Sequence, residues 1–473
     1  MIRSILIFRI LLLVISGSSL VAQSQPDDSP NVLLILSDDH SYPYLGCYGH
    51  PDLKTPNLDR LASEGVLFNH AYTAAAQCVP SRASILTGRS VLDVDMARFS
   101  APLPANVKTI PDYLNQKGYF TGICGRHYHL DGSSYMADAT AQAFEKYDLI
   151  TFPERVNYLR NGTDDEVLEQ FTAFLEQVPD GKPFFMWMNY SDPHRKFTAD
   201  DYEPVPESVT VPESMPDLPE VRADLAAHLG EINRLDNNVG KVLNEIKTRG
   251  LEANTIIVFM GDNGAALLRG KGTLYDLGLH VPLIIKWPGG FPSNKLSEVL
   301  VSGEDILPTL LDAANIEPDQ EVTGISLLPA ILGGDYDPHQ YLFAHRGTHG
   351  TGLPIHTARF DIVRTAFNRD YRLIYNLLWP LPFTPVDFNN SKMWKKLNEM
   401  HEQGTLEEKY DNAFFSVPRP MFELYDRRND PYELNNLSGN PKYSKLEYQL
   451  KAALHEWMIL NHDYAPLPIP PVR

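Results

Sequence analysis

A cysteine and an arginine four residues apart are the first side chains whose spacing indicates chemistry. Cys78 and Arg82 lie in a segment that we expect to run from a loop into a helix, because Pro80 suits the first helical position and Gly88 can end the helix. Cys78 then lies at the positively polarised start of the helix, where free N–H groups stabilise anions and lower a thiol pKa. Arg82 can reach back toward the thiol. The segment therefore predicts a reactive nucleophile beside an anion site.

Two pairs of residues with side-chain oxygens follow two buried strand patterns. Each pair comes shortly after a continuous apolar run of strand length: Asp38-Asp39 after residues 31–36, and Asp262-Asn263 after residues 255–260. Ligands of open α/β sheets bind at the carboxyl ends of the strands. Carboxylate and amide oxygens are the ligands that hard divalent cations prefer. The two pairs therefore predict a site for one divalent cation.

Several cationic and imidazole side chains also follow strand patterns. The net charge of −19 argues against nucleic acid as a partner, and it means that an anionic substrate needs a local cluster of positive charge. The candidates for that cluster are Arg126, His127 and His129 after a strand expected over residues 119–124, His194 after one expected over residues 184–189, and Lys271 after the second oxygen-bearing pair.

Apolar runs of strand length alternate with helical patterns through the N-terminal part of the chain. Such alternation predicts an α/β fold in which helices sandwich a large, mostly parallel sheet. The expected strands span residues 31–36, 119–124, 184–189, 255–260, 282–287 and 298–301, and a long amphipathic helix is expected over residues 223–249.

The pattern changes near residue 358. Two runs predict a hairpin, a third strand follows, and a helix is expected after it; these elements span residues 360–365, 371–376, 422–426 and 444–460. We therefore expect an N-terminal catalytic domain over residues 25–357 and a smaller α+β C-terminal subdomain over residues 358–473.

Residues 1–24 have the composition of a secretory signal peptide. Basic residues flank a short apolar run, and small residues around Ala22 suit cleavage. The run is interrupted at Gly17 and is too short for a membrane anchor, and no later stretch is long and apolar enough to span a bilayer. We therefore expect a secreted or periplasmic protein without a membrane span.

The string that begins at Cys78 resembles the C-x-P-S-R and L-T-G signature of the type I sulfatases, which belong to the alkaline phosphatase-like superfamily. The match covers Cys78, Pro80, Ser81, Arg82, Leu86, Thr87 and Gly88. The resemblance implies an alkaline phosphatase-like fold. It also implies that a maturation enzyme oxidises Cys78 to formylglycine, whose hydrated aldehyde is the nucleophile. Cys47 and Cys124 then remain, and they can be paired or free.

The resemblance also implies the metal. Sulfatases carry one calcium ion beside the formylglycine, and the matching ligands here are Asp38, Asp39, Cys78 in its modified form, Asp262 and Asn263. Ligand types alone do not separate calcium from magnesium.

Charge neutralisation and proton transfer are assigned by the same resemblance. Arg82, Arg126 and Lys271 would offset the charge on the sulfuryl oxygens. His194, in a Pro-His motif after a strand, or Lys271 would protonate the departing sugar oxygen.

One motif departs from the family pattern. Where relatives have Gly-Lys-x-His, this chain has Gly125-Arg126-His127-Tyr128-His129, with arginine for lysine and one extra residue. Arginine keeps the charge and adds a fork of donors. We prefer His129 as the base that regenerates the aldehyde, because a leucine follows it as in the family, and His127 is the alternative.

These features predict a secreted sulfatase that hydrolyses sulfate esters of a sulfated carbohydrate, such as a marine polysaccharide or a glycosaminoglycan oligosaccharide. The altered motif at residues 125–129 is consistent with a polysaccharide-active branch of the family. Two alternatives stay open. One is a phosphodiesterase or phosphonate monoester hydrolase of the same superfamily, and the other is a catalytically silent relative that binds carbohydrate.

Overall fold

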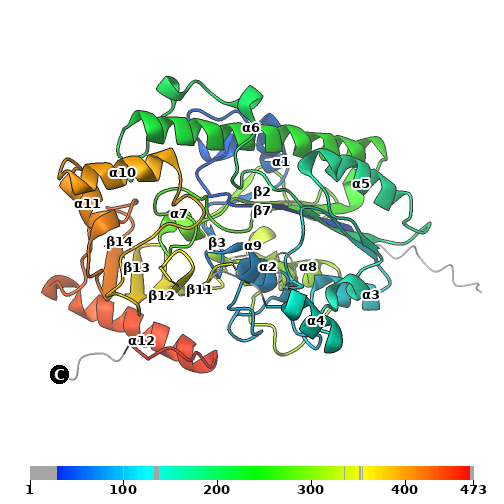
Figure 1. Cartoon of the computed structure of the whole chain (residues 1–473). Coiled ribbons are helices and arrows are strands. Elements are labelled where there is room, and N and C mark those ends of the chain that lie inside the picture. Colours follow the sequence, from blue (N-terminus) through cyan, green and yellow to red (C-terminus); the bar gives the residue numbers. More distant parts are fainter. Residues whose placement is uncertain are drawn as a thin grey trace, which may run out of the picture.

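The structure is a computed structural model that describes residues 29–99, 101–132, 138–334, 336–350, 353 and 355–468. The expected signal peptide, residues 1–24, lies outside the described residues. Figure 1 shows a larger unit, in which helices enclose a sheet, beside a smaller C-terminal unit that carries its own sheet. Among the described residues, no helix has the length and apolar character needed to cross a bilayer.

An eight-stranded sheet forms the centre of the larger unit, in the order β5-β4-β6-β1-β7-β8-β2-β9. Strands β4, β6, β1 and β7 pair in parallel, whereas β8 runs antiparallel to its neighbours β7 and β2. The expected large, mostly parallel sheet is confirmed. Its strands are β1 (Asn31–Ser37), β2 (Val66–Phe68), β4 (Phe120–Gly125), β5 (Tyr158–Leu159), β6 (Phe184–Asn189), β7 (Thr255–Gly261), β8 (Leu283–Lys286) and β9 (Lys295–Ser297).

Helices cover both faces of this sheet because its central strands are apolar on both faces. Leu33 and Ile35 of β1 pack in one core with α1, α5 and α6, while Leu34 and Leu36 pack in the other with α2, α3 and α8. Each such side chain contributes about 1.5–3 kcal/mol of burial free energy. The helices of this unit are α1 (Pro56–Ser63), α2 (Cys78–Thr87), α3 (Ile110–Gln116), α4 (Asp138–Lys146), α5 (Val167–Leu175), α6 (Pro219–Thr248), α7 (Asp276–Leu279), α8 (Ile306–Ala313) and α9 (Leu328–Ile331).

The smaller unit has a four-stranded antiparallel sheet, β11-β12-β13-β14. The expected hairpin, third strand and final helix are present as β12 (Phe360–Phe367), β13 (Tyr371–Asn376), β14 (Phe422–Asp426) and α12 (Ser444–Leu460), and α10 (Lys392–Glu402) and α11 (Glu408–Phe415) were not expected. The first strand, β11 (Leu342–Thr348), also lacked a sequence prediction and precedes residue 358. The small sheet therefore starts earlier than the expected subdomain, and the boundary itself stays a prediction.

The strand expected over residues 298–301 is wrong as a single element. The chain instead forms β9, which pairs with β2, and then β10 (Val301–Ser302), which pairs with β3 (Ala71–Tyr72) in a separate two-stranded sheet. Of the expected strand only Val301 lies in a strand, because residues 298–300 connect β9 to β10 and so pass from one sheet to the other.

Strand register places the candidate site residues together. Ser37 at the end of β1 pairs with Gly261 at the end of β7, so the residues that follow these strands emerge side by side. On the other side of β6, Gly125 ends β4 opposite Asn189. Gly125 has a φ of +84°, and a Cβ there would lie 2.0 Å from the carbonyl oxygen of Asn189. The strand end that carries Arg126 therefore requires glycine.

We predict that Gly125→Ala destabilises the protein far more than Gly118→Ala. Gly118 also has a positive φ, +93°, but nothing lies within 4 Å of the position that a Cβ would take there. The backbone penalty of about 1–2 kcal/mol applies at both sites, and the clash with Asn189 adds about 1–3 kcal/mol at Gly125 only. Urea unfolding of the two variants measures the difference. Equal losses would show that the contact between β4 and β6 is not tight.

Candidate active site

Four buried residues meet where β1 and β7 end. The backbone N–H of Asp39 donates to Oδ1 of Asp262 over 3.0 Å, and Nδ2 of Asn263 donates to Oδ1 of Asp39 over 2.8 Å. Asp39 has a φ of +63°, in the left-handed region that few residues other than glycine adopt. None of Asp38, Asp39, Asp262 and Asn263 is exposed to solvent. The two oxygen-bearing pairs that the sequence singled out therefore form one cluster.

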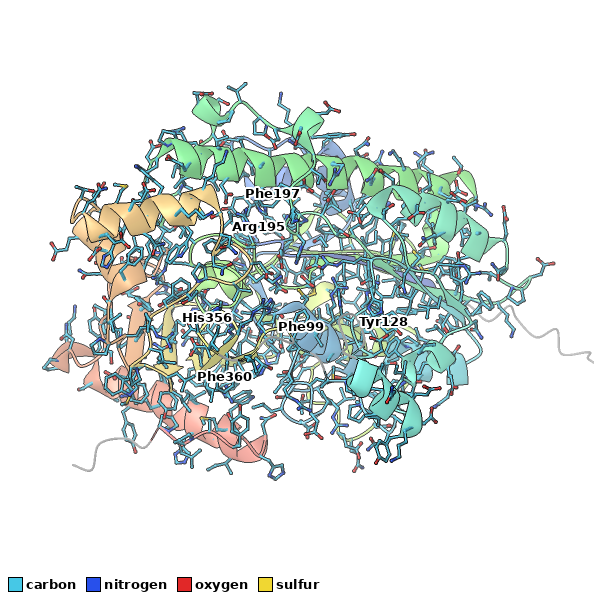
Figure 2. The ribbon with its side chains drawn as sticks, in the orientation of Figure 1. Phe99, Tyr128, Arg195, Phe197, His356 and Phe360 are labelled. Atoms are coloured by element: carbon cyan, nitrogen blue, oxygen red, sulfur yellow. The ribbon has the colours of Figure 1, made fainter. Side chains whose placement is uncertain are left out.

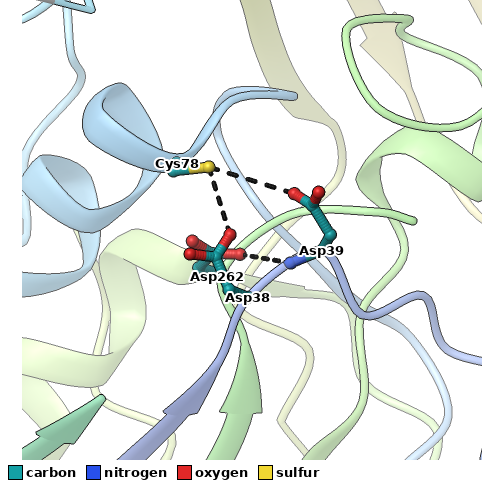
Figure 3. A group of neighbouring side chains, drawn as sticks. All are labelled: Asp38, Asp39, Cys78 and Asp262. Carbon is teal, nitrogen blue, oxygen red and sulfur yellow. Dashed lines mark hydrogen bonds between the residues drawn. The ribbon is translucent and has the colours of Figure 1, made fainter. Parts of the chain in front are cut away.

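Cys78 lies at the start of α2 and faces this cluster. Its thiol donates to Oδ1 of Asp38 over 3.2 Å and lies 3.9 Å from Oδ1 of Asp39, as Figure 3 shows. The helix spans Cys78–Thr87 and Gly88 caps its end, as expected. It begins two residues earlier than expected, so that Pro80 occupies its third position and not its first.

The expected lowering of the thiol pKa is wrong. Burial, together with the carboxylates of Asp38 and Asp262, raises the pKa of Cys78 well above its usual range. The favourable potential of a helix N-terminus is outweighed because the thiolate would be desolvated among negative charges. At neutral pH the unmodified side chain is therefore a neutral thiol and a poor nucleophile.

Arg82 is a fully buried cation that joins three strand ends. Its Nε donates to Oδ2 of Asp262 over 2.9 Å, its Nη2 to Oδ2 of Asp38 over 3.1 Å, and its Nη1 to Oδ1 of Asn189 over 2.6 Å. It reaches the carboxylates that surround Cys78. Asn189 was not singled out from the sequence, although an amide at the last position of a buried strand is the kind of signal that identified Asn263.

The cluster fits a divalent cation. Ligand atoms of Asp38, Asp39, Cys78 and Asp262 all lie within 4.8 Å of one another. Oδ1 of Asn263 is buried and has no hydrogen-bond partner among the residues that the structure describes. Burial raises the pKa of Asp39 and of Asp262 to about 7, which shows that this region favours added positive charge. These oxygen donors match the preference of a hard cation.

Two further cations flank Cys78. Nη1 of Arg126 lies 2.5 Å from Oδ2 of Asp38, and Nζ of Lys271 lies 2.8 Å from Oδ1 of Asp39. Because both carboxylates also face the thiol, the two cations lie around the position of the sulfur. Although burial lowers it, the pKa of Lys271 is raised well above its usual range by Asp387 and Asp39, so this side chain stays charged.

His194 lies at the outer side of the cluster and is 20% exposed. Its Nε2 is 3.7 Å from Oδ2 of Asp39 and 3.7 Å from Oδ2 of Asp387. Burial, with Lys271 and Arg126 nearby, lowers the pKa of His194 to about 3, so the imidazole is neutral at physiological pH.

The two candidate histidines of the altered motif have different surroundings. His127 directs Nε2 to Asp131, 3.2 Å away, and its Nδ1 accepts from the backbone N–H of His129 over 3.0 Å. His129 is buried, has a φ of +63°, and its pKa is lowered well below the usual range by burial and by Arg126 and Arg82. His129 is therefore a neutral imidazole, and the choice between it and His127 as the base stays a prediction.

Residues from the smaller unit also enter the site, and no sequence signal pointed to them. Oδ2 of Asp387, in the loop between β13 and α10, lies 2.7 Å from Nζ of Lys271, and Oδ1 lies 3.3 Å from Nε2 of His349. Nδ1 of His349 contacts Nε2 of Gln77 over 3.2 Å, and Gln77 directly precedes Cys78 in the chain.

All three cysteines are unpaired. Of the two alternatives for Cys47 and Cys124, a disulfide or free thiols, the structure therefore has free thiols.

Comparisons with known proteins agree with this geometry. A family model described as Sulfatase matches residues 30–316, and one described as N-sulphoglucosamine sulphohydrolase, C-terminal, matches residues 268–390. The chain is 30% identical to human N-sulphoglucosamine sulphohydrolase, over 92% of this chain and 90% of that protein. It is 26% identical to an ulvan-active sulfatase of Formosa agariphila, over 93% of this chain and 76% of that protein.

Solved structures share the fold at lower identity. A protein solved with its substrate D-glucosamine-2-N,6-O-disulfate superimposes with a TM-score of 0.68 at 20% identity, covering 93% of this chain and 99% of that one. A phosphonate monoester hydrolase of Agrobacterium radiobacter also gives 0.68, at 19% identity, covering 91% and 96%. These two structures establish an alkaline phosphatase-like architecture for the chain.

We predict that Ca²⁺ stabilises metal-stripped protein more at about pH 8 than at about pH 6. Asp39 and Asp262 have a folded-state pKa near 7, above the usual value of 3.8, so the ion-free fold loses stability as pH rises from about 4 through 7. A bound cation counters that loss and competes with protons below pH 7. Thermal unfolding with and without Ca²⁺ measures the shift.

Asp39→Asn should abolish the response to Ca²⁺ in that experiment. Asp319→Asn, which removes a partly exposed carboxylate paired with Lys108, should leave it intact. A Ca²⁺ shift of equal size at both pH values would contradict binding at the buried carboxylates.

Proposed function

Because the chain belongs to the sulfatase family and is a sulfuric ester hydrolase, we propose that it is a secreted enzyme that removes sulfate from a sulfated carbohydrate through a formylglycine made from Cys78. The observation that carries the proposal is the convergence at one strand edge of Cys78, the carboxylate cluster and the cations Arg126 and Lys271. The secretion part rests on the composition of residues 1–24.

The substrate class is supported by the names of two relatives. One is an N-sulphoglucosamine sulphohydrolase and the other is an ulvan-active sulfatase, and both match more than nine tenths of this chain. We propose a glycosaminoglycan oligosaccharide or a marine polysaccharide as the substrate. Measuring sulfate release from a panel that contains N-sulfated and O-sulfated glucosamine and ulvan oligosaccharides tests the choice.

In this proposal the chain acquires its nucleophile by modification of Cys78 and its metal by binding. A maturation enzyme would convert Cys78, and the hydrated aldehyde supplies a hydroxyl that can attack sulfur. One Ca²⁺, held by Asp38, Asp39, Asp262, Asn263 and the modified residue, would supply positive charge beside that hydroxyl and the sulfuryl oxygens. The neutral, buried thiol of Cys78 supports the need for such a conversion.

The remaining catalytic roles are assigned to side chains of this protein. Arg82 holds Asp38 and Asp262 in place from a fully buried position. Arg126 and Lys271 bind the sulfuryl oxygens and offset the charge that develops on them in the transition state. His194, at the outer side of the cluster, is neutral and is therefore placed to donate a hydrogen bond to the departing sugar oxygen. Lys271, which stays charged, is the alternative donor and the one that carries a proton to give.

Return of the site to its starting state needs a base. His129, or His127 as the alternative, would take the proton from the remaining hydroxyl so that sulfate leaves. Burial and the neighbouring arginines lower the pKa of His129, which keeps it neutral and able to accept a proton.

The rival function is hydrolysis of a phosphonate or phosphate ester. The phosphonate monoester hydrolase of similar structure supports only the shared fold. Matched aryl sulfate and aryl phosphonate substrates separate the two functions, because a sulfatase should turn over the sulfate preferentially. A carbohydrate-binding relative without activity would bind sulfated oligosaccharides and release no sulfate from them.

We predict that the peptide containing Cys78, isolated from protein secreted by its native host, carries an aldehyde in place of the thiol. Intact-peptide mass spectrometry measures the replacement. Cys78→Ala should lower the rate of sulfate release by a factor of about 10³ or more. An unmodified thiol in fully active protein would contradict the proposed nucleophile.

We also predict that His194→Ala loses more activity on sugar sulfates than on aryl sulfates with good leaving groups. The loss on the sugar should be about 10²- to 10³-fold, because a poor leaving group needs the hydrogen bond to its developing negative charge. Lys271→Ala should lose similar factors on both, since it contacts the sulfuryl group of any substrate. The reverse pattern would assign the proton donor to Lys271.

A further inference from the structure

Asp387 brings a negative charge to the side of the site where a substrate must enter. Its side chain is 27% exposed, the highest fraction among the carboxylates around Lys271. Oδ2 lies 2.7 Å from Nζ of Lys271 and 3.7 Å from Nε2 of His194, the two side chains placed to contact the sulfuryl group and the leaving oxygen. Any group held by Lys271 therefore lies close to this carboxylate.

The surrounding structure fixes Asp387 in this position. Its φ is +63°, and its neighbour Val386 packs so closely on Gly272 that a Cβ at that glycine would lie 2.3 Å from Cγ2 of the valine. On the other side, Phe388 lies 5.9 Å from the guanidinium of Arg195, which also stacks on Phe197. Figure 2 shows Arg195 and Phe197 together above the centre of the molecule.

A hydrogen-bonded chain orients the carboxylate. Nε2 of Gln77 contacts Nδ1 of His349, so that nitrogen accepts and Nε2 of His349 carries the proton toward Oδ1 of Asp387. The ring of Phe99 packs edge-on against His349 at 4.8 Å. Asp387 is thus tied to the residue that directly precedes Cys78, and its second oxygen is left to face Lys271.

We propose that Asp387 limits the charge that the site accepts, so that a singly charged sulfate ester binds in preference to a doubly charged phosphate monoester. This inference rests on the proposed function. The two ester groups have the same tetrahedral shape, so contacts alone separate them poorly. They differ in charge, since a phosphate monoester carries about −1.5 to −2 at neutral pH. A fixed carboxylate beside the binding cations repels the extra charge and so selects against the wrong ligand.

The test measures binding of phenyl sulfate and phenyl phosphate by calorimetry in the full chain carrying Cys78→Ala, which prevents turnover. At about pH 8 the phosphate ester holds both charges, because its second pKa is about 6. Asp387→Asn keeps the size of the side chain and removes its charge. We expect the affinity for phenyl phosphate relative to phenyl sulfate to rise by about tenfold or more in this variant.

Two controls isolate the charge at this position. Asp387→Glu keeps the charge, and Asp319→Asn removes a remote one, so both should leave the affinity ratio within about twofold of the parent. If Asp387→Asn changes both affinities by the same factor, Asp387 only supports the structure and the proposal is overturned. A shift of the ratio in Asp319→Asn would overturn it as well.

A second measurement needs no substitution at Asp387, so it tests the proposal even if the Asp387→Asn variant does not fold. Lowering the pH from about 8 to about 5 leaves phenyl sulfate singly charged and protonates phenyl phosphate. The affinity ratio of the parent protein should then move toward the phosphate ester, and a constant ratio counts against the proposal. Failure of the proposed function is seen separately, as absent sulfate release by matured protein that still discriminates between the two esters.

Discussion

A buried guanidinium between two buried carboxylates is the interaction on which the site depends. Arg82 leaves the first turns of α2 and bonds to Asp38 and Asp262, which emerge from neighbouring strands, and to Asn189 at the end of a third strand. Removing one partner from such a buried group costs about 3–5 kcal/mol, because the remaining charge is left buried and unpaired. The same pairing fixes the helix that carries Cys78 against the carboxyl edge of the sheet.

This constraint explains how an acidic protein can bind an anion. With a net charge of −19 the surface repels sulfated sugars, yet three cations meet around Cys78. Each cation is held there by a carboxylate that needs it: Arg82 and Arg126 by Asp38, and Lys271 by Asp39. In the proposed site the carboxylates thus have two roles, since they would provide the ligands for a divalent cation and they hold the three cationic side chains charged and in place.

The smaller unit completes the site. Lys271 belongs to the larger unit, but Asp387 reaches it from a segment of the smaller unit, and His349, from the same unit, contacts Asp387. The reactive centre and the residues that select its substrate therefore come from different parts of the chain. In such an arrangement, the reaction can be kept while loops of the smaller unit change the preferred ligand.

Some of this could be predicted from the sequence, because the relevant signals are local. Apolar runs identified the central strands, since a strand buried on both faces must be apolar along its whole length. The positions of Asp38 and Asp262 after such runs were enough to place them together, because parallel strands end at one edge. The helix that follows Cys78 and its end at Gly88 were likewise predicted from neighbouring residues, although the helix begins at Cys78 and not at Pro80.

Only the tertiary structure decided the features that depend on residues far apart in the chain. The pKa of the Cys78 thiol rises because burial and the carboxylates that follow β1 and β7 outweigh the stabilising effect of the helix N-terminus on a thiolate. Neither the burial nor the approach of these carboxylates can be predicted from the residues next to Cys78. Residues 298–300 form a connection and not a strand, because the chain leaves β2 after Ser297 and pairs with β3 only from Val301. Asp387 and His349 occupy positions without a periodic or spacing signal, and their roles come only from the packing that brings Asp387 to Lys271 and His349 to Asp387. Sequence patterns fix local conformation, whereas charge, burial and proximity are properties of the folded chain.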